Sequence, residues 1–185
     1  MNIYLVRHTA VAVEMGTFYG HTDVDLADTF RQEVRSVLKK LPDNPDAVYS
    51  SPSTRCVRLA SRIDPDPVLD PRIMELNFGQ WEMRTWRDIP RDVIEPWYAD
   101  YVNQSCPEGE SFGVMFARVV EFFEELRARK HQTAVVVCHG GVVRSFLVHV
   151  LGMPLNRAYA MHIDFGGVSR IVCDGTGANV RYVNR

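Results

Sequence analysis

The apolar run at residues 133–138, with the residues that follow it, restricts the possible folds of this chain more than any other stretch. Residues 134–138 read Ala-Val-Val-Val-Cys, a composition that suits a buried strand. His139-Gly140-Gly141 ends the run, and from residue 142 to 151 the apolar spacing becomes helical. A buried strand that turns directly into a helix indicates an α/β fold built on a central sheet.

The same alternation of strands and helices recurs along the chain. The other expected strands cover residues 3–6, 46–51, 68–69, 169–173 and 180–183. The other expected helices cover residues 26–41, 52–63 and 110–129. The first of these helices has Asp25 or Asp28 as a cap and Pro42 as a stop. The pattern predicts a three-layer α/β/α sandwich with a mostly parallel central sheet.

The chain length predicts a single domain over residues 1–185. Residues 76–110 interrupt the alternation with an aromatic-rich tract, and we expect this insertion to form a cap over one end of the sheet. A formal net charge of -2 and 24% charged residues give no general attraction to nucleic acid or to a membrane surface. Affinity for anions must therefore come from locally placed arginines.

The cysteines and the N-terminus point to a cytoplasmic protein. Cys56, Cys106, Cys138 and Cys173 have neither a paired spacing nor a Cys-x-x-Cys metal motif, so we expect reduced thiols. The N-terminus has no basic segment followed by a long apolar one, and the longest apolar runs have the length of strands. The sequence carries no information on the oligomeric state.

Polar side chains stand at or just past the ends of three predicted strands. Arg7-His8 follow the first strand, Arg55 lies just past the second, and His139 ends the run described above. Because ligands of open α/β sheets bind outside the carboxyl ends of the strands, we expect these side chains to share one crevice. Guanidinium groups bind phosphate oxygens in bidentate geometry. The sequence therefore predicts a site for a small phosphorylated substrate.

The same residues predict a chemistry for that site. An imidazole is a competent phosphoryl acceptor near neutral pH, so His8 is the expected nucleophile, and His139 would stabilise the charge on five-coordinate phosphorus. Expulsion of an alkoxide requires a proton, and Glu75, which lies among apolar residues, is expected to supply it and then to activate water. Glu82 and Glu110 are weaker candidates. No His-x-x-x-His pair suggests a metal, and we expect no cofactor.

Residues 138–145 offer a competing chemistry. They satisfy Cys-x5-Arg-Ser and resemble the signature of cysteine-dependent protein phosphatases, with Cys138 as the nucleophile and Arg144 as the phosphate clamp. The residue before the cysteine is Val137 instead of the histidine usual in that family. This interpretation also leaves the residues at the other strand ends without a role, so we rank it lowest.

Taken together, the motifs resemble the histidine phosphatase superfamily, also called phosphoglycerate-mutase-like, over essentially the whole chain. The matching stretches are residues 5–8, 20–26 and 50–55, Glu75, and His139-Gly140. The resemblance implies the fold of that superfamily, a phosphohistidine at His8 and a phosphate surrounded by Arg7, Arg55 and His139. It also implies that Glu75 is the proton donor.

Further substrate contacts are expected from Tyr19, Gly20 and Gly140. Two departures from the family pattern bear on the site. Thr9 stands where a glycine usually follows the nucleophile, and Glu14 stands where many members have an asparagine that contacts phosphate. A carboxylate there would repel phosphate, so we do not expect Glu14 to take over that contact.

Within the superfamily, residues 75–84 and 107–111 are most similar to α-ribazole phosphatases, which dephosphorylate α-ribazole 5'-phosphate in assembling the nucleotide loop of cobalamin. This resemblance implies the same substrate here. The alternatives are a broad-specificity small-molecule or sugar phosphatase of the superfamily, a phosphoglycerate mutase, and the Cys138-dependent phosphatase. The chain lacks the extra length of the mutases, which favours net hydrolysis.

Overall fold

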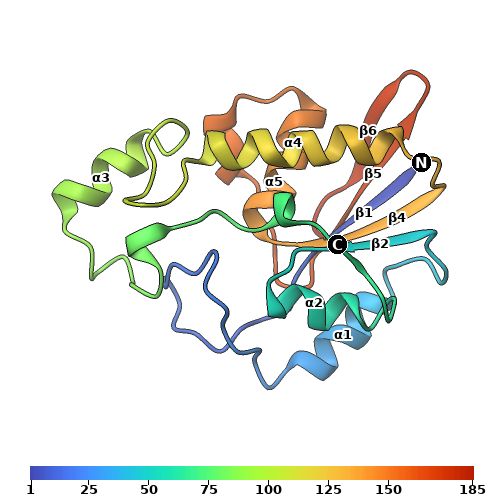
Figure 1. The fold of residues 1–185 in the computed structure, drawn as a ribbon, viewed down its shortest axis with the longest axis horizontal. Coiled ribbons are helices and arrows are strands. Elements are labelled where there is room, and N and C mark those ends of the chain that lie inside the picture. Colours follow the sequence, from blue (N-terminus) through green and yellow to red (C-terminus); the bar gives the residue numbers. More distant parts are fainter.

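The computed structural model describes residues 1–185 and is built around a six-stranded sheet (Figure 1). The strands are β1 (Asn2–Arg7), β2 (Ala47–Ser50), β3 (Val68–Leu69), β4 (Thr133–Cys138), β5 (Val168–Asp174) and β6 (Gly177–Tyr182). Their order across the sheet is β3-β2-β4-β1-β5-β6. The pairs from β3 to β1 are parallel and the pairs from β1 to β6 are antiparallel. The prediction of a mostly parallel sheet is confirmed.

Helices cover both faces of the sheet. The helices α1 (Phe30–Leu38) and α2 (Thr54–Ala60) lie on one face, and α4 (Phe112–Ala128) and α5 (Gly140–Leu151) lie on the other (Figure 1). Side chains alternate along β1, where Leu5 joins the core cluster of α4 and α5 while Val6 packs with Val34 and Val37 of α1. Successive strand residues point to opposite faces, so an unbroken apolar run suits a sheet covered on both sides. The three-layer α/β/α prediction is therefore confirmed.

The first helix begins later than the sequence predicted. The expected start near Leu26 and the expected caps Asp25 and Asp28 are wrong, because α1 begins at Phe30 after Thr29. Leu26 instead forms an isolated bridge with Val11 in an extended stretch, and a turn at residues 28–29 leads into the helix. The helical spacing of the apolar residues could not distinguish this extended stretch from a first helical turn. The remaining predicted elements are found within a few residues of their expected ends.

The strand β1 occupies the middle of the sheet, and its carboxyl end is held by the main chain. Arg7 is in register with Cys138 of β4, and the amide of His8 donates to the Cys138 carbonyl at 2.9 Å. The amide of Gly166, from the segment leading into β5, is within hydrogen-bonding distance of the carbonyls of Arg7 and His8, at 3.2 and 3.1 Å. The backbone that carries the predicted cation and nucleophile is therefore fixed from both sides.

The segment at residues 76–110 contains the short 3-10 helix η2 (Gly79–Trp81) and the helix α3 (Arg91–Ala99). In Figure 1, α3 lies beyond the sheet, on the side away from the N-terminus, which is the side of the carboxyl end of β1. Another 3-10 helix, η3 (Leu155–Ala160), follows α5. No helix combines the length and the apolar character that crossing a membrane requires.

Candidate active site

A cavity of about 170 Å³ opens where β1 and β4 end. Arg7 and His8 reach it from the end of β1, His139 and Gly140 from the end of β4, and Glu75 from the loop before η2. The fold thus brings four of the five predicted catalytic side chains into the lining of one cavity. This is the arrangement expected when strand ends converge.

One hydrogen bond determines the tautomer of His8. Its Nδ1 atom lies 2.7 Å from the carbonyl oxygen of Thr9, and because a carbonyl can only accept, Nδ1 carries the proton and Nε2 keeps a lone pair. The residue is buried, with 2% exposure. Burial, followed by the charges of Arg55 and Arg7, lowers the pKa of His8 well below 6.5. The imidazole is therefore neutral at pH 7, which is the form that attack at phosphorus requires.

His139 is held in the other neutral tautomer. Its Nδ1 lies 3.3 Å from Nη2 of Arg55, which can only donate, and its Nε2 lies 2.8 Å from the hydroxyl oxygen of Ser51. Nδ1 therefore accepts and Nε2 donates. Burial and the charge of Arg55 lower the pKa of His139 well below 6.5. The ring centroids of His139 and His8 are 5.3 Å apart, so both imidazoles can face one small group.

The two arginines occupy different depths. Arg7 lines the cavity, donates from Nη1 to the carbonyl of Ile163 at 2.6 Å, and lies 3.8 Å from the ring centre of Phe165. Arg55 is fully buried outside the cavity lining, and its Nη atoms donate to the carbonyls of Thr22 and Gly20. The Nε atoms of both arginines are buried without a partner. The expected bidentate clamp from Arg55 would thus require its carbonyl contacts to exchange.

Glu75 is held against the first turn of α5. Its Oε2 accepts from the amide of Gly141 at 3.0 Å, and its Oε1 accepts from the amide of Leu76 at 2.9 Å. A Cβ atom on Gly141 would lie 2.3 Å from Oε1 of Glu75. A glycine is therefore required at position 141 for the carboxylate to approach the helix.

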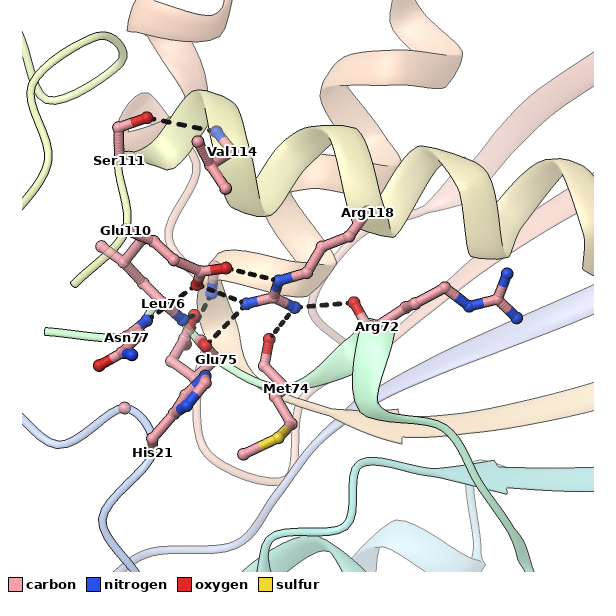
Figure 2. A network of polar contacts seen from close by, with 12 residues as sticks. His21, Arg72, Met74, Glu75, Leu76, Asn77, Glu110, Ser111, Val114 and Arg118 are labelled. Atoms are coloured by element: carbon pink, nitrogen blue, oxygen red, sulfur yellow. Dashed lines mark hydrogen bonds and ion pairs between the residues drawn. The ribbon is translucent and has the colours of Figure 1, made fainter. Parts of the chain in front are cut away.

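Arg118 of α4 fixes the main chain on both sides of Glu75 (Figure 2). Its Nη1 donates to the carbonyls of Arg72 and Met74, each at 2.7 Å, and its Nη2 donates to the Glu75 carbonyl at 2.9 Å. The same guanidinium pairs with Glu110 at 2.9 and 2.8 Å. We call the Arg118–Glu110 pair the acid clamp, because its contacts fix the position of the main chain from which the Glu75 side chain extends.

The two weaker acid candidates have structural partners instead. Glu82 accepts from the amides of Gly20, His21 and Thr22, and Glu110 accepts from Arg118. Burial alone would raise the pKa of each carboxyl, but the bonds from His21 and Gly20 lower that of Glu82 and the bond from Arg118 lowers that of Glu110. Neither group lines the cavity, whereas Glu75 does.

Gly20, one of the expected substrate contacts, lies outside the cavity lining. Its amide donates to Glu82 at 2.9 and 3.0 Å, its carbonyl accepts from Arg55, and it does not line the cavity. A Cβ on Gly20 would lie 1.7 Å from the carbonyl oxygen of Leu76, so close packing of two backbones accounts for this glycine. Tyr19, the other residue predicted from this loop, does line the cavity.

The environment of Cys138 opposes the alternative chemistry. The thiol is fully buried, and this burial, followed by the neighbouring Cys56 and Glu75, raises its pKa well above 9. A nucleophilic cysteine needs the opposite shift. Cys138 does not line the cavity, although Arg144 from the same motif does. The signature is therefore present in the sequence without the environment that it requires.

Several lining residues have no predicted role in histidine-dependent chemistry. Arg144 donates from Nε to the carbonyl of Met161 at 3.0 Å, and its guanidinium lies 4.9 Å from the ring centre of Tyr159. Its spacing of four from Gly140 on a helix could have identified it, because such residues share a face. Thr17, Phe18 and Tyr159 come from loops and a 3-10 turn, where the sequence has no periodicity to follow.

Nowhere in the chain do three or more His, Cys, Asp or Glu side chains form a group suited to a metal ion. All four cysteines are free and buried.

Comparison with known proteins gives a consistent result. The family model of the histidine phosphatase superfamily (branch 1) matches residues 3–185. The chain is 27% identical over 194 residues to the adenosylcobalamin/alpha-ribazole phosphatase of Escherichia coli K12, covering 100% of this chain and 96% of that protein. It is 26% identical over 181 residues to phosphoserine phosphatase 1 of Hydrogenobacter thermophilus, covering 92% and 86%.

A solved structure shares the fold. The crystal structure of the alpha-ribazole phosphatase from Shigella flexneri superposes with a TM-score of 0.89 at 26% identity, covering 100% of this chain and 96% of that one.

Proposed function

The chain belongs to the histidine phosphatase superfamily (branch 1), and from this premise we propose that it is a phosphomonoesterase that forms a phosphohistidine at Nε2 of His8. The observation that carries the proposal is the bond from Nδ1 of His8 to the Thr9 carbonyl. It leaves the lone pair on Nε2 of a neutral, buried imidazole beside Arg7 and His139. A free lone pair next to anion-binding groups suits in-line attack on a phosphate ester.

The reaction would proceed in two steps. In the first, Nε2 of His8 bonds to phosphorus as the ester P–O bond breaks, and the protonated carboxyl of Glu75 gives its proton to the departing alkoxide. In the second, the Glu75 carboxylate takes a proton from water, the water oxygen bonds to phosphorus and the P–N bond breaks. Inorganic phosphate and the neutral imidazole are released, and Glu75 is again protonated.

Arg7 and the beginning of α5 would bind the phosphate oxygens. The buried Nε of Arg7 has no partner in the protein, and α5 begins at Gly140 beside the Arg7 guanidinium. A helix N-terminus and guanidinium donors both favour anions. His139 would stabilise the five-coordinate phosphorus by turning its Nε2–H from the Ser51 hydroxyl to a phosphate oxygen. These groups supply positive charge, so we propose that turnover needs no metal ion.

The proposed substrate is α-ribazole 5'-phosphate, in assembly of the nucleotide loop of cobalamin. Support comes from the resemblance of residues 75–84 and 107–111 to α-ribazole phosphatases and from the two relatives of that name that align over the whole chain. Phosphoserine is the second candidate, because a phosphoserine phosphatase aligns at similar identity. A broad-specificity phosphatase and a phosphoglycerate mutase complete the set of alternatives.

A substrate panel separates these activities. Inorganic phosphate release is measured with α-ribazole 5'-phosphate, phosphoserine, sugar phosphates and 3-phosphoglycerate, with and without EDTA. We expect the highest kcat/KM for α-ribazole 5'-phosphate, no effect of EDTA, and net phosphate release. Equal turnover of the whole panel would favour the broad-specificity alternative, and isomerisation of 3-phosphoglycerate without phosphate release would indicate a mutase.

A further inference from the structure

A second cavity, which we call the aromatic pocket, lies beside the phosphate-sized one. Its volume is about 660 Å³, and nine of its eleven lining residues are hydrophobic. Phe18, Phe78 and Tyr159 line both cavities, so the two are in contact through these rings. The rest of the lining comes mainly from α3, from the loop before it and from η3. A group attached to a phosphate in the first cavity would therefore meet the second.

The rings of this pocket are only partly used in packing the protein. Trp97 is buried in the core, but Trp86 and Tyr98 are 42% and 65% exposed, with ring centroids 5.5 Å apart in edge-to-face geometry. Phe18 lies 5.2 Å from Trp86, which joins this pair to the shared wall. Exposed aromatic rings gathered around a cavity indicate a binding surface more than a core.

The charges at the aromatic pocket restrict what can occupy it. No aspartate or glutamate lines it, and its one charged residue is Arg157. An ammonium group would find no counter-ion there. Besides the rings, Asn156 and Arg157 give the lining hydrogen-bond donors. A flat ring that carries a heteroatom acceptor matches both features.

We propose that the aromatic pocket is the leaving-group subsite, and that it selects phosphate esters whose alcohol carries a planar, uncharged aromatic heterocycle. The proposal rests on the phosphomonoesterase activity proposed above and adds a determinant of its specificity. It disfavours phosphoserine, whose small leaving group carries an ammonium and would leave the rings uncovered. It also assigns a use to the expected cap, because α3 supplies Trp97 and Tyr98.

The test uses two substrates that share a leaving group and differ in the ring. α-Ribazole 5'-phosphate and ribose 5-phosphate both release a primary 5' alcohol of ribose, and only the first carries a base. Stacking of a base on aromatic side chains predicts a kcat/KM about 10- to 100-fold higher for the base-bearing ester. Adenosine 5'-phosphate, with a different heterocycle, should also exceed ribose 5-phosphate.

Variants then locate the effect. Tyr98→Ala and Trp86→Ala should each lower the ratio of the two kcat/KM values by about 5-fold or more, and Tyr98→Phe, which keeps the ring, should not. Val93→Ala, an exposed position of the same helix outside the pocket, is the matched control. Turnover of ribose 5-phosphate by each variant reports whether the protein is folded.

The outcomes distinguish the two proposals. If wild-type protein hydrolyses both esters with equal kcat/KM, or if the alanine variants leave the ratio unchanged, the subsite is wrong while the phosphatase stands. If wild-type protein releases phosphate from no ester, the proposed function itself is wrong.

Discussion

The phosphate cavity and the aromatic pocket share three rings, yet they are built by opposite means. The four predicted catalytic side chains in the phosphate cavity are each fixed by hydrogen bonds, such as that from His8 to the Thr9 carbonyl and that from Gly141 to Glu75. The aromatic pocket is shaped by rings in contact, two of them largely exposed. A hydrogen bond fixes the orientation of the two groups that it joins, whereas contact between apolar rings contributes mainly through the surface area that it buries. The first cavity is therefore suited to chemistry and the second to selection.

The largest effect should come from removing the nucleophile. His8→Ala should lower kcat/KM by about 10⁴-fold or more for every ester, because the other imidazole of the cavity, His139, has both ring nitrogens engaged by Arg55 and Ser51 and cannot replace the nucleophile. The measurement is phosphate release, together with trapping of an acid-labile phosphoenzyme in wild-type protein. Cys138→Ser is the comparison variant and should keep most activity. If the His8→Ala protein kept wild-type turnover and the Cys138→Ser protein were inactive, Cys138 and not His8 would be the nucleophile.

A large effect that depends on the leaving group is expected at the proton donor. Glu75→Gln should lower the rate for an alkyl phosphate by about 10²- to 10⁴-fold, the range usual for general acid catalysis. For p-nitrophenyl phosphate, whose leaving group needs no proton, the first step should change much less. Stopped-flow measurement of p-nitrophenol release isolates that step. An equal loss for both esters would mean that Glu75 binds phosphate and donates no proton.

A smaller effect of the same kind should follow from loosening the acid clamp. Arg118→Met leaves Glu110, which is 18% exposed, without its partner and frees three carbonyls, so stability should fall by about 3 kcal/mol. Displacement of Glu75 should lower turnover of alkyl esters by about 10- to 100-fold and that of p-nitrophenyl phosphate less. Urea unfolding and the two rates are the measurements.

Arg127→Met is the matched control for the clamp. Arg127 lies on the same helix and pairs with Glu124 at 3.4 Å, and the two side chains are 43% and 46% exposed, so its loss should cost about 1 kcal/mol or less and leave both rates unchanged. If Arg118→Met lowers the two rates equally, the clamp contributes to folding without orienting the acid.

The smallest effect concerns pH and separates the buried imidazoles from the aromatic pocket, whose lining includes no histidine. Burial and the two arginines hold the pKa of His8 and of His139 well below 6.5. As pH falls below 6.5, the unfolded chain takes up protons that the folded protein refuses. The free energy of unfolding should therefore decrease, by at most about 1.4 kcal/mol per pH unit for each histidine. His8→Ala should remove roughly half of this dependence in urea titrations.

The difference between the two cavities also explains what the sequence could predict. The chemistry of the phosphate cavity follows from strand ends, where Arg7-His8 and His139 stand after recognisable apolar runs. Prediction from the spacing of apolar residues was wrong for the start of α1, because a helical spacing also fits the extended backbone at Leu26. The positions of the strand ends predicted that Arg55 lies near the phosphate. No pattern in the sequence indicated that its guanidinium would donate to the carbonyls of Thr22 and Gly20.

The aromatic pocket lay largely beyond sequence reasoning. Its rings come from α3, from the loop before it and from η3, which are brought together by the tertiary fold alone. An aromatic-rich tract indicated an insertion, but aromatic side chains are more often core than binding surface. Only the exposure of Trp86 and Tyr98 in the folded chain separates these two uses.

The central position of β1 has a consequence for how the protein is made. Asn2 pairs with Thr133 on one side and with Val172 on the other, so the strand that leads to the nucleophile is synthesised well before both of its neighbours and must wait for them. At 5–20 residues per second, roughly ten seconds separate Asn2 from Thr133 on the ribosome. Such long-range pairing predicts slow folding, with an apolar segment open to aggregation meanwhile. The catalytic pair would thus become functional only after β4 and β5 have been synthesised and have paired with β1.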